Sequence, residues 1–122
     1  MTRQLSVLVV EDEPLISMML EDFLDCLGHR CAAATGLLKD AMALAEAGDF
    51  DVAIVDLNLA GGLSAEPVMD ILERTGKPFL VASGDLGYTG RAAPMLNKPY
   101  HMVNLERGLE VLAPAVVASE AA

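Results

Sequence analysis

The sequence predicts an α/β fold in which one doubly wound, parallel sheet of five strands is combined with five helices. Two observations support this prediction. Short and almost continuously apolar runs, such as Leu5–Val10 and Asp51–Asp56, are typical of strands that are covered on both faces of a parallel sheet. Longer segments with apolar residues at helical spacing lie between these runs, and such an alternation indicates parallel strands joined by helical crossovers.

Each strand is predicted by a short apolar run bounded by polar residues, glycine or proline. The second strand has the weakest signal, because it begins with arginine and consists mainly of alanine. The five expected strands are Leu5–Val10, Arg30–Ala34, Asp51–Asp56, Pro78–Ala82 and Pro94–Asn97.

The first three helices are predicted from apolar periodicity and from residues that favour helix ends. Pro14 suits the first turn of the first helix, where its missing N–H has no intrahelical partner to lose, and Gly28 is expected to end that helix. Thr35 is expected to cap a second helix that ends at about Ala47, and Ser64 is expected to cap the third.

Two further helices are expected in the second half of the chain. A parallel crossover between the last two strands requires a helix between Gly84 and Pro94, but three glycines in this segment, at about 1 kcal/mol each, make it marginal. The fifth helix is expected over His101–Leu112. The alanine-rich residues 113–122 that follow are expected to fray.

Length and charge limit the classes of function. The 122 residues suffice for a single domain, residues 1–122 with a core over 5–112, and we expect no output domain. The chain has 18 acidic and 8 basic residues and a formal net charge of −10, which argues against nucleic-acid binding because that requires a basic surface. No apolar run approaches the roughly 20 residues of a membrane span, so we expect a cytoplasmic protein without membrane contact.

Polar side chains follow four of the apolar runs. Acidic residues begin at Glu11 directly after the first run, Asp56 ends the third, Ser83 follows the fourth and Lys98 follows the fifth. The carboxyl ends of parallel strands converge on one edge of the sheet, where ligands bind. Carboxylates, a hydroxyl and an amine that meet there suit a divalent metal ion and a phosphoryl group.

The order and spacing of these residues resemble the receiver domain of bacterial two-component response regulators, from Leu5 to about Leu112. The resemblance implies a flavodoxin-like sheet with strand order 2-1-3-4-5. The segment Pro78–Gly84 looks like the Pro-Phe-x-x-Ala-Thr-Gly signature of stand-alone receivers from alphaproteobacteria. Residues 58–62 fit the Asn-Leu-x-Gly that often follows the acceptor in that subgroup.

The resemblance assigns the acidic residues to a phosphorylation site. Asp56 would be the phosphoryl acceptor, since a carboxylate can attack phosphorus and form an acyl phosphate. Glu11 and Asp12 would hold Mg²⁺ or Mn²⁺ together with Asp56, and Glu11 would act directly or through water. The family adds a backbone carbonyl two residues past the acceptor, which here belongs to Asn58.

The resemblance also assigns the residues that handle the phosphate. Lys98 would pair with the acceptor at rest and with a phosphate oxygen afterwards, and Ser83 would donate its hydroxyl to another phosphate oxygen. Gly84 would leave space for the phosphate and for a partner, and the bond from Lys98 to Pro99 is cis in the family. Receivers usually carry an aromatic residue in the fifth strand, where this chain has Met95, so we expect no aromatic gating there.

The leading prediction is therefore a phosphoacceptor that takes a phosphoryl group on Asp56 from a histidine kinase or a histidine phosphotransferase. Such a protein is a switch that catalyses only its own phosphorylation and slow dephosphorylation. Its target protein would dock on the face formed by the fourth helix, the fifth strand and the fifth helix.

Two alternatives remain open at this point. A small aspartyl-phosphate hydrolase is suggested by Asp56-Leu57-Asn58, but haloacid-dehalogenase-type phosphatases need a second aspartate where Asn58 stands. A degenerate receiver that only binds partners is the other alternative, and the intact acids and lysine argue against it.

Overall fold

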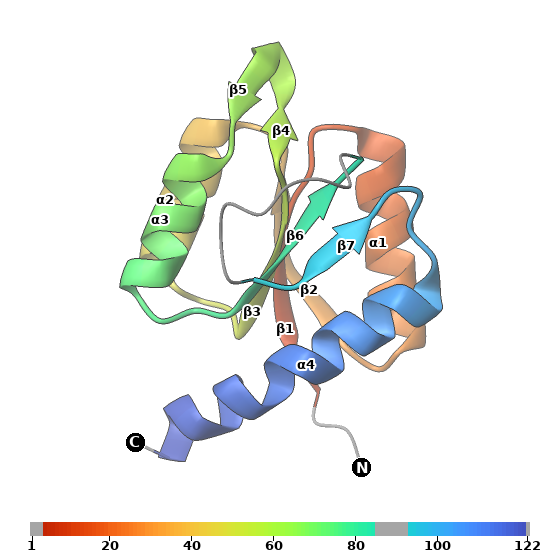
Figure 1. The fold of residues 1–122 in the computed structure, drawn as a ribbon, viewed down its shortest axis with the longest axis vertical. Coiled ribbons are helices and arrows are strands. Elements are labelled where there is room, and N and C mark those ends of the chain that lie inside the picture. Colours follow the sequence, from red (N-terminus) through yellow and green to blue (C-terminus); the bar gives the residue numbers. More distant parts are fainter. Residues whose placement is uncertain (1–3, 85–92, 122) are drawn as a thin grey trace.

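The computed structural model describes residues 4–84 and 93–121, with side chains described as far as Val116. One parallel sheet has the strand order β2-β1-β3-β6-β7, with helices on both of its faces (Figure 1). Its strands are β1 (Ser6–Val10), β2 (Arg30–Thr35), β3 (Val52–Asp56), β6 (Phe79–Ser83) and β7 (Met95–Asn97). The helices within the described residues are α1 (Pro14–Cys26), α2 (Leu38–Ala47), α3 (Glu66–Arg74) and α4 (Met102–Ala121).

The predicted fold and strand order are confirmed, since β6 and β7 are the fourth and fifth strands of this sheet. The helix that we expected between Gly84 and Pro94 falls on residues 85–92, which lie outside the described residues. No helix of the described part combines the length and apolar character that crossing a bilayer requires.

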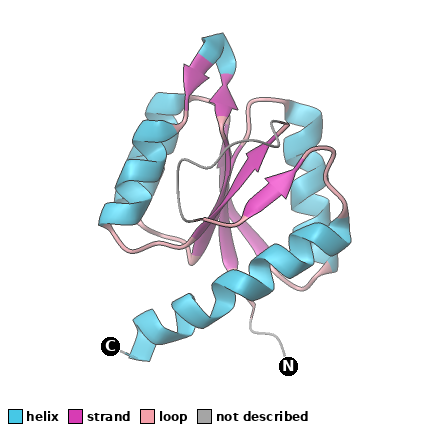
Figure 2. Cartoon of the chain, viewed as in Figure 1, coloured by secondary structure: helices cyan, strands magenta, loops and turns pink. Residues whose placement is uncertain are grey.

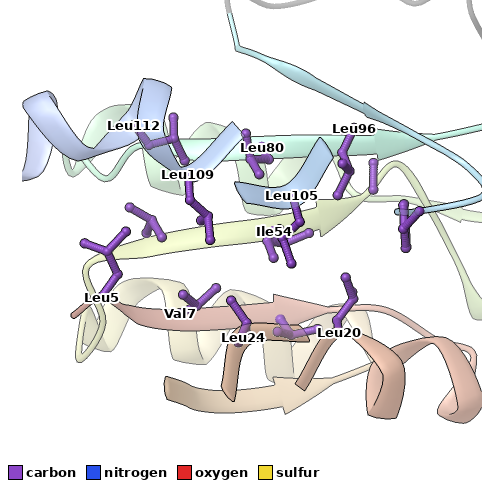
Figure 3. Packing of buried hydrophobic residues seen from close by; sticks show 14 of the residues in the cluster. Leu5, Val7, Leu20, Leu24, Ile54, Leu80, Leu96, Leu105, Leu109 and Leu112 are labelled. Carbon is purple, nitrogen blue, oxygen red and sulfur yellow. The ribbon is translucent and has the colours of Figure 1, made fainter. Parts of the chain in front are cut away.

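The core has two halves because alternate residues of each strand face opposite sides of the sheet. Val7 and Val9 of β1 pack with α1 and α4, whereas Leu8 and Val10 pack with α2 and α3. Figure 3 shows the first half, in which leucines of α1 and α4 cover the strands. Complete burial of one such side chain stabilises the fold by roughly 1.5–3 kcal/mol, so the apolar strands hold the loops at their ends in place.

The predicted helix caps are wrong for α2 and α3. Thr35 ends β2 and Ser64 lies just before α3, and each hydroxyl oxygen accepts a hydrogen bond, at 3.2 Å, from the backbone N–H two residues further on. These bonds form hydroxyl turns before the helices rather than caps. The N-cap positions belong instead to Leu37 and Ala65. In α1, by contrast, Pro14 is the first helical residue, as predicted.

The loop expected over residues 58–62 is part of a small hairpin. Strand β4 (Asn58–Leu59) pairs with β5 (Leu63–Ser64) in antiparallel fashion across the 3-10 turn Ala60–Gly62. Gly61 and Gly62 have φ angles of 76° and 74°, a conformation that glycine adopts without a steric penalty. The hairpin projects beyond the carboxyl edge of the main sheet (Figure 2).

The last helix is longer than predicted. We expected residues 113–122 to fray, but α4 continues through Pro114 to Ala121. Val116 is 4% exposed and extends the apolar stripe of Leu109 and Leu112 at helical spacing, so it anchors the extra turns to the core. Met102, at the start of the helix, is exposed.

Candidate functional site

The carboxyl ends of four strands bring the predicted site residues to one edge of the sheet. Glu11 follows β1 directly, and its backbone N–H donates to the carbonyl of Thr35, at 2.9 Å, so it leaves the sheet from a fixed position. Asp56 and Ser83 are the last residues of β3 and β6, and Lys98 follows β7. The buried strands thus place an acid, a hydroxyl and an amine around the same edge.

Asp56 has a different partner on each carboxylate oxygen. Its Oδ1 accepts a hydrogen bond from the backbone N–H of Asn58, at 3.2 Å, and its Oδ2 accepts one from the Lys98 ammonium, at 3.1 Å. The residue is 3% exposed. Asn58 is therefore held beside Asp56, while the role of its carbonyl in metal binding stays a prediction.

Lys98 links Asp56 and Glu11 to the end of β6. Its Nζ lies 3.1 Å from Asp56 Oδ2 and 3.7 Å from Glu11 Oε1, and its backbone N–H donates to the carbonyl of Ser83 at 3.1 Å. Burial alone would lower the pKa of Lys98, but the hydrogen bond and charges of the two acids outweigh it and raise the pKa. The lysine is therefore cationic, and the bond to Pro99 is cis as predicted.

Glu11, Asp12 and Asp56 form the predicted acidic cluster. One carboxylate oxygen of each lies within 4.8 Å of the others. Gly36 allows this approach, because a Cβ at that position would stand 2.6 Å from the Asp12 Cα and 3.0 Å from the Glu11 carbonyl oxygen. These oxygens are the ligands that Mg²⁺ and Mn²⁺ prefer, so the donor set fits such an ion.

Burial, together with the neighbouring Asp56, makes Glu11 a weaker acid than usual. Burial is the largest cause that raises its pKa, from 4.5 to about 7, and the hydrogen bond and charge of Asp56 add to it. The backbone N–H of Glu13, 3.2 Å from Glu11 Oε2, and the Lys98 charge act in the opposite direction. Without a cation, the cluster favours a proton on Glu11 near neutral pH.

This raised pKa predicts how the metal-free protein responds to pH. The folded state binds the Glu11 proton more tightly than the unfolded state does. The contribution of Glu11 to the free energy of unfolding is therefore fully present below pH 4.5 and is lost as the pH rises through about 7. The free energy of unfolding in EDTA should fall by up to roughly 3 kcal/mol more in wild type than in Glu11→Gln, which keeps the shape without the charge. Urea titrations between pH 4 and 8 measure this, and parallel profiles would contradict the shift.

Asp12→Ala should separate metal binding from folding. In wild type, Mg²⁺ at 100 times its dissociation constant should raise the free energy of unfolding by about 2.7 kcal/mol. The variant should lose this gain, yet its metal-free stability should equal or exceed that of wild type because one like charge is gone. Thermal melts with MgCl₂ and with EDTA test both expectations. Asp22→Ala, at an exposed position of α1, is the control.

Gly36 and Tyr100 belong to the site but were not predicted. The Tyr100 hydroxyl donates to Glu11 Oε1, at 3.3 Å, and the ring centroid lies 5.9 Å from Lys98 Nζ. Burial, followed by the charges of Glu11 and Asp56, raises the pKa of Tyr100, so its hydroxyl keeps its proton. Both residues carry a weak signal: an isolated glycine after a strand indicates close approach, and a buried tyrosine usually has a hydroxyl partner.

Ser83 and Gly84 stand where the resemblance requires them. Ser83 is buried at 2% exposure and pairs with Asn97 across β6 and β7. Gly84 is exposed, and a Cβ added there would meet no described atom within 4 Å. That Gly84 leaves space for a phosphate and for a partner stays a prediction.

Comparison with known proteins places this geometry in a family, although no family model matches the sequence. The phyllosphere-induced regulator PhyR of Methylorubrum extorquens is 32% identical over 106 residues, which make up 81% of this chain and 40% of PhyR. The chain thus spans less than half the length of this curated relative.

Solved structures match almost the whole chain. SdrG from Sphingomonas melonis Fr1 is 36% identical, with a TM-score of 0.79, over 96% of this chain and 99% of SdrG. The receiver domain of the PhyR response regulator from Erythrobacter litoralis is 29% identical, with a TM-score of 0.76, and the match covers 89% of each chain.

A more distant match supports the fold alone. The receiver domain of the sensor histidine kinase PA1611 from Pseudomonas aeruginosa PAO1 has a TM-score of 0.78 at 20% identity, over 92% of this chain and 99% of that domain. In that structure a magnesium ion is coordinated in the active-site cleft. With the predicted strand order and the converging acids, the matches to PhyR and SdrG show that the chain belongs to the receiver-domain family of bacterial response regulators.

Proposed function

We propose that the chain is a phosphoacceptor, which takes a phosphoryl group onto Asp56 from a phosphohistidine with the help of a divalent cation. One observation carries this proposal: the Asp56 carboxylate lies 3.1 Å from the Lys98 ammonium and within 4.8 Å of carboxylate oxygens of Glu11 and Asp12. A nucleophile, a cationic phosphate ligand and a set of metal ligands are thus combined in one place.

Mg²⁺ or Mn²⁺ would be held by Asp12 and Asp56, by Glu11 directly or through water, and by the Asn58 carbonyl. When bound, the ion neutralises charge on the phosphoryl group during transfer. Three carboxylates face a single lysine in this cluster, so two further positive charges, which one divalent ion supplies, complete the balance.

The residues of the chain would carry out the transfer in one displacement. A carboxylate oxygen of Asp56 forms a bond to phosphorus while the bond from phosphorus to the donor histidine nitrogen breaks, and the electron pair stays on the imidazole. Lys98 then moves from Asp56 to a phosphoryl oxygen, and the Ser83 hydroxyl donates to another. The product is an acyl phosphate that water hydrolyses slowly.

This chemistry makes the protein a signalling switch that acts on itself, rather than an enzyme with a separate substrate. The phosphodonor would be a histidine kinase or a histidine phosphotransferase. A target would read the phosphorylated state on the face of β7 and α4, where Met95, Arg107 and Val111 help to line a groove of about 440 Å³.

Incubation with acetyl phosphate tests the proposal without knowledge of the partner. Intact mass spectrometry should find one added phosphoryl group in the presence of MgCl₂, and none after the metal is removed with EDTA. Uptake that proceeds equally well in EDTA would contradict the metal-dependent mechanism, and the absence of uptake under both conditions would contradict the acceptor role.

A further inference from the structure

Tyr100 joins the loop after β7 to the acid after β1. Its ring belongs to the core cluster between the sheet, α1 and α4, and the residue is 5% exposed. Its hydroxyl is directed away from that apolar surrounding and donates to Glu11 Oε1 at 3.3 Å. This separation exceeds the usual O–H···O distance of about 2.7–2.8 Å, so the contact has room to shorten.

Both oxygens of the Glu11 carboxylate have donors close by. Oε2 accepts from the backbone N–H of Glu13 at 3.2 Å, while Oε1 faces the Tyr100 hydroxyl and, at 3.7 Å, the Lys98 ammonium. Within the described residues, Tyr100 is the only uncharged side chain that donates to Glu11. Of the two side chains near Oε1, Tyr100 carries its polar group on a ring that packs in the core, whereas Lys98 carries its ammonium on a flexible chain.

The difference between the Tyr100 and Lys98 side chains matters once a phosphoryl group arrives. Lys98 has a flexible stem and would move to the phosphoryl oxygens, which weakens its contact with Glu11. Tyr100 cannot follow, because its ring is fixed by the core residues around it. Of the two side-chain donors, Tyr100 is therefore the one that stays on Glu11 throughout the transfer.

We propose that Tyr100 is a positioning residue of the metal site: its hydroxyl fixes the Glu11 carboxylate toward the cation while Lys98 serves the phosphoryl group. The inference rests on the proposed function, since it assigns Glu11 to that cation. Hydrogen bonds that orient a metal ligand typically change metal affinity by about 10–100-fold when they are removed. A long bond such as this one belongs at the lower end of that range.

Tyr100→Phe tests the inference, because it removes the hydroxyl and keeps the packed ring. The Mg²⁺ concentration needed to raise the melting temperature by a fixed amount should be about tenfold higher than in wild type. At saturating Mg²⁺, phosphorylation by acetyl phosphate should return to nearly the wild-type rate, which a general loss of structure would not allow. Thr75→Val, which removes a hydroxyl bonded to the Ile71 carbonyl away from the site, should leave the Mg²⁺ titration unchanged.

A double-mutant cycle shows whether Tyr100 acts through Glu11. Glu11→Ala should weaken Mg²⁺ binding, and addition of Tyr100→Phe to that variant should change it no further. An Mg²⁺ requirement in Tyr100→Phe equal to that of wild type, or an equal further loss in the Glu11→Ala background, would overturn the inference. A wild-type protein that ignores Mg²⁺ would instead contradict the proposed function, so the two failures are distinguishable.

Discussion

Replacing Asp56 with asparagine is expected to abolish uptake of a phosphoryl group from acetyl phosphate while the protein stays folded. The amide has the shape of the carboxylate, and its oxygen can still accept the hydrogen bond from the Asn58 backbone N–H. It is no nucleophile toward phosphorus, however. Intact mass spectrometry after incubation with MgCl₂ measures the effect, and the expected adduct is absent even at long times.

The matched control for this variant is Asp49→Asn. Asp49 is exposed and precedes β3, at the opposite end of the strand from Asp56. The control should take up the phosphoryl group as wild type does. A phosphoryl adduct in Asp56→Asn with the same yield as in wild type would show that another residue is the acceptor and would contradict the assignment of Asp56.

Lys98→Met should impair both chemistry and stability. Methionine keeps most of the apolar stem but leaves Asp56 and Glu11, 3% and 4% exposed, without their counter-charge. Removal of one partner of a buried ion pair lowers the free energy of unfolding by about 3–5 kcal/mol. Because the Lys98 side chain is 25% exposed, we expect a smaller loss of roughly 1–3 kcal/mol in EDTA. Phosphorylation should slow by at least about 100-fold, the loss typical of a deleted electrostatic contact.

Relative to wild type, stabilisation by Mg²⁺ should increase in Lys98→Met, whereas it should disappear in Asp12→Ala. Mg²⁺ should stabilise Lys98→Met by more than it stabilises wild type, because it supplies the missing positive charge. Denaturant titrations with MgCl₂ and with EDTA give both quantities. Equal stability of Lys98→Met and wild type in EDTA would show that the lysine does not balance the acids.

The part of the site that could be predicted consists of residues at strand ends. Asp56, Ser83 and Lys98 each follow an apolar run, and a parallel sheet brings the carboxyl ends of such runs to one edge. This prediction needs no measured distance, because the alternation of strands and helices already indicates at which edge of the sheet these residues lie. The acidic cluster followed from the same pattern, whereas the strand order was implied by the resemblance to receiver domains.

The remainder depends on contacts that the pattern does not contain. Tyr100 reads as a core aromatic residue, and its bond to Glu11 requires the path of the loop between β7 and α4. The sequence predicts Thr35 and Ser64 as helix caps, but a hydroxyl before a helix can also form a turn, and both residues do so here. The helical turns beyond Leu112 were missed because alanine-rich ends fray unless a side chain such as Val116 anchors them.

The attachment site of the phosphoryl group tests the central claim most directly. The protein should be phosphorylated with acetyl phosphate and MgCl₂, treated with borohydride, which reduces an acyl phosphate to an alcohol, and then digested for peptide mass spectrometry. We predict that residue 56 alone is converted to homoserine, and that the conversion disappears when EDTA replaces MgCl₂. Conversion at Glu11, at Asp12 or at an exposed acid, with residue 56 unchanged, would contradict the account.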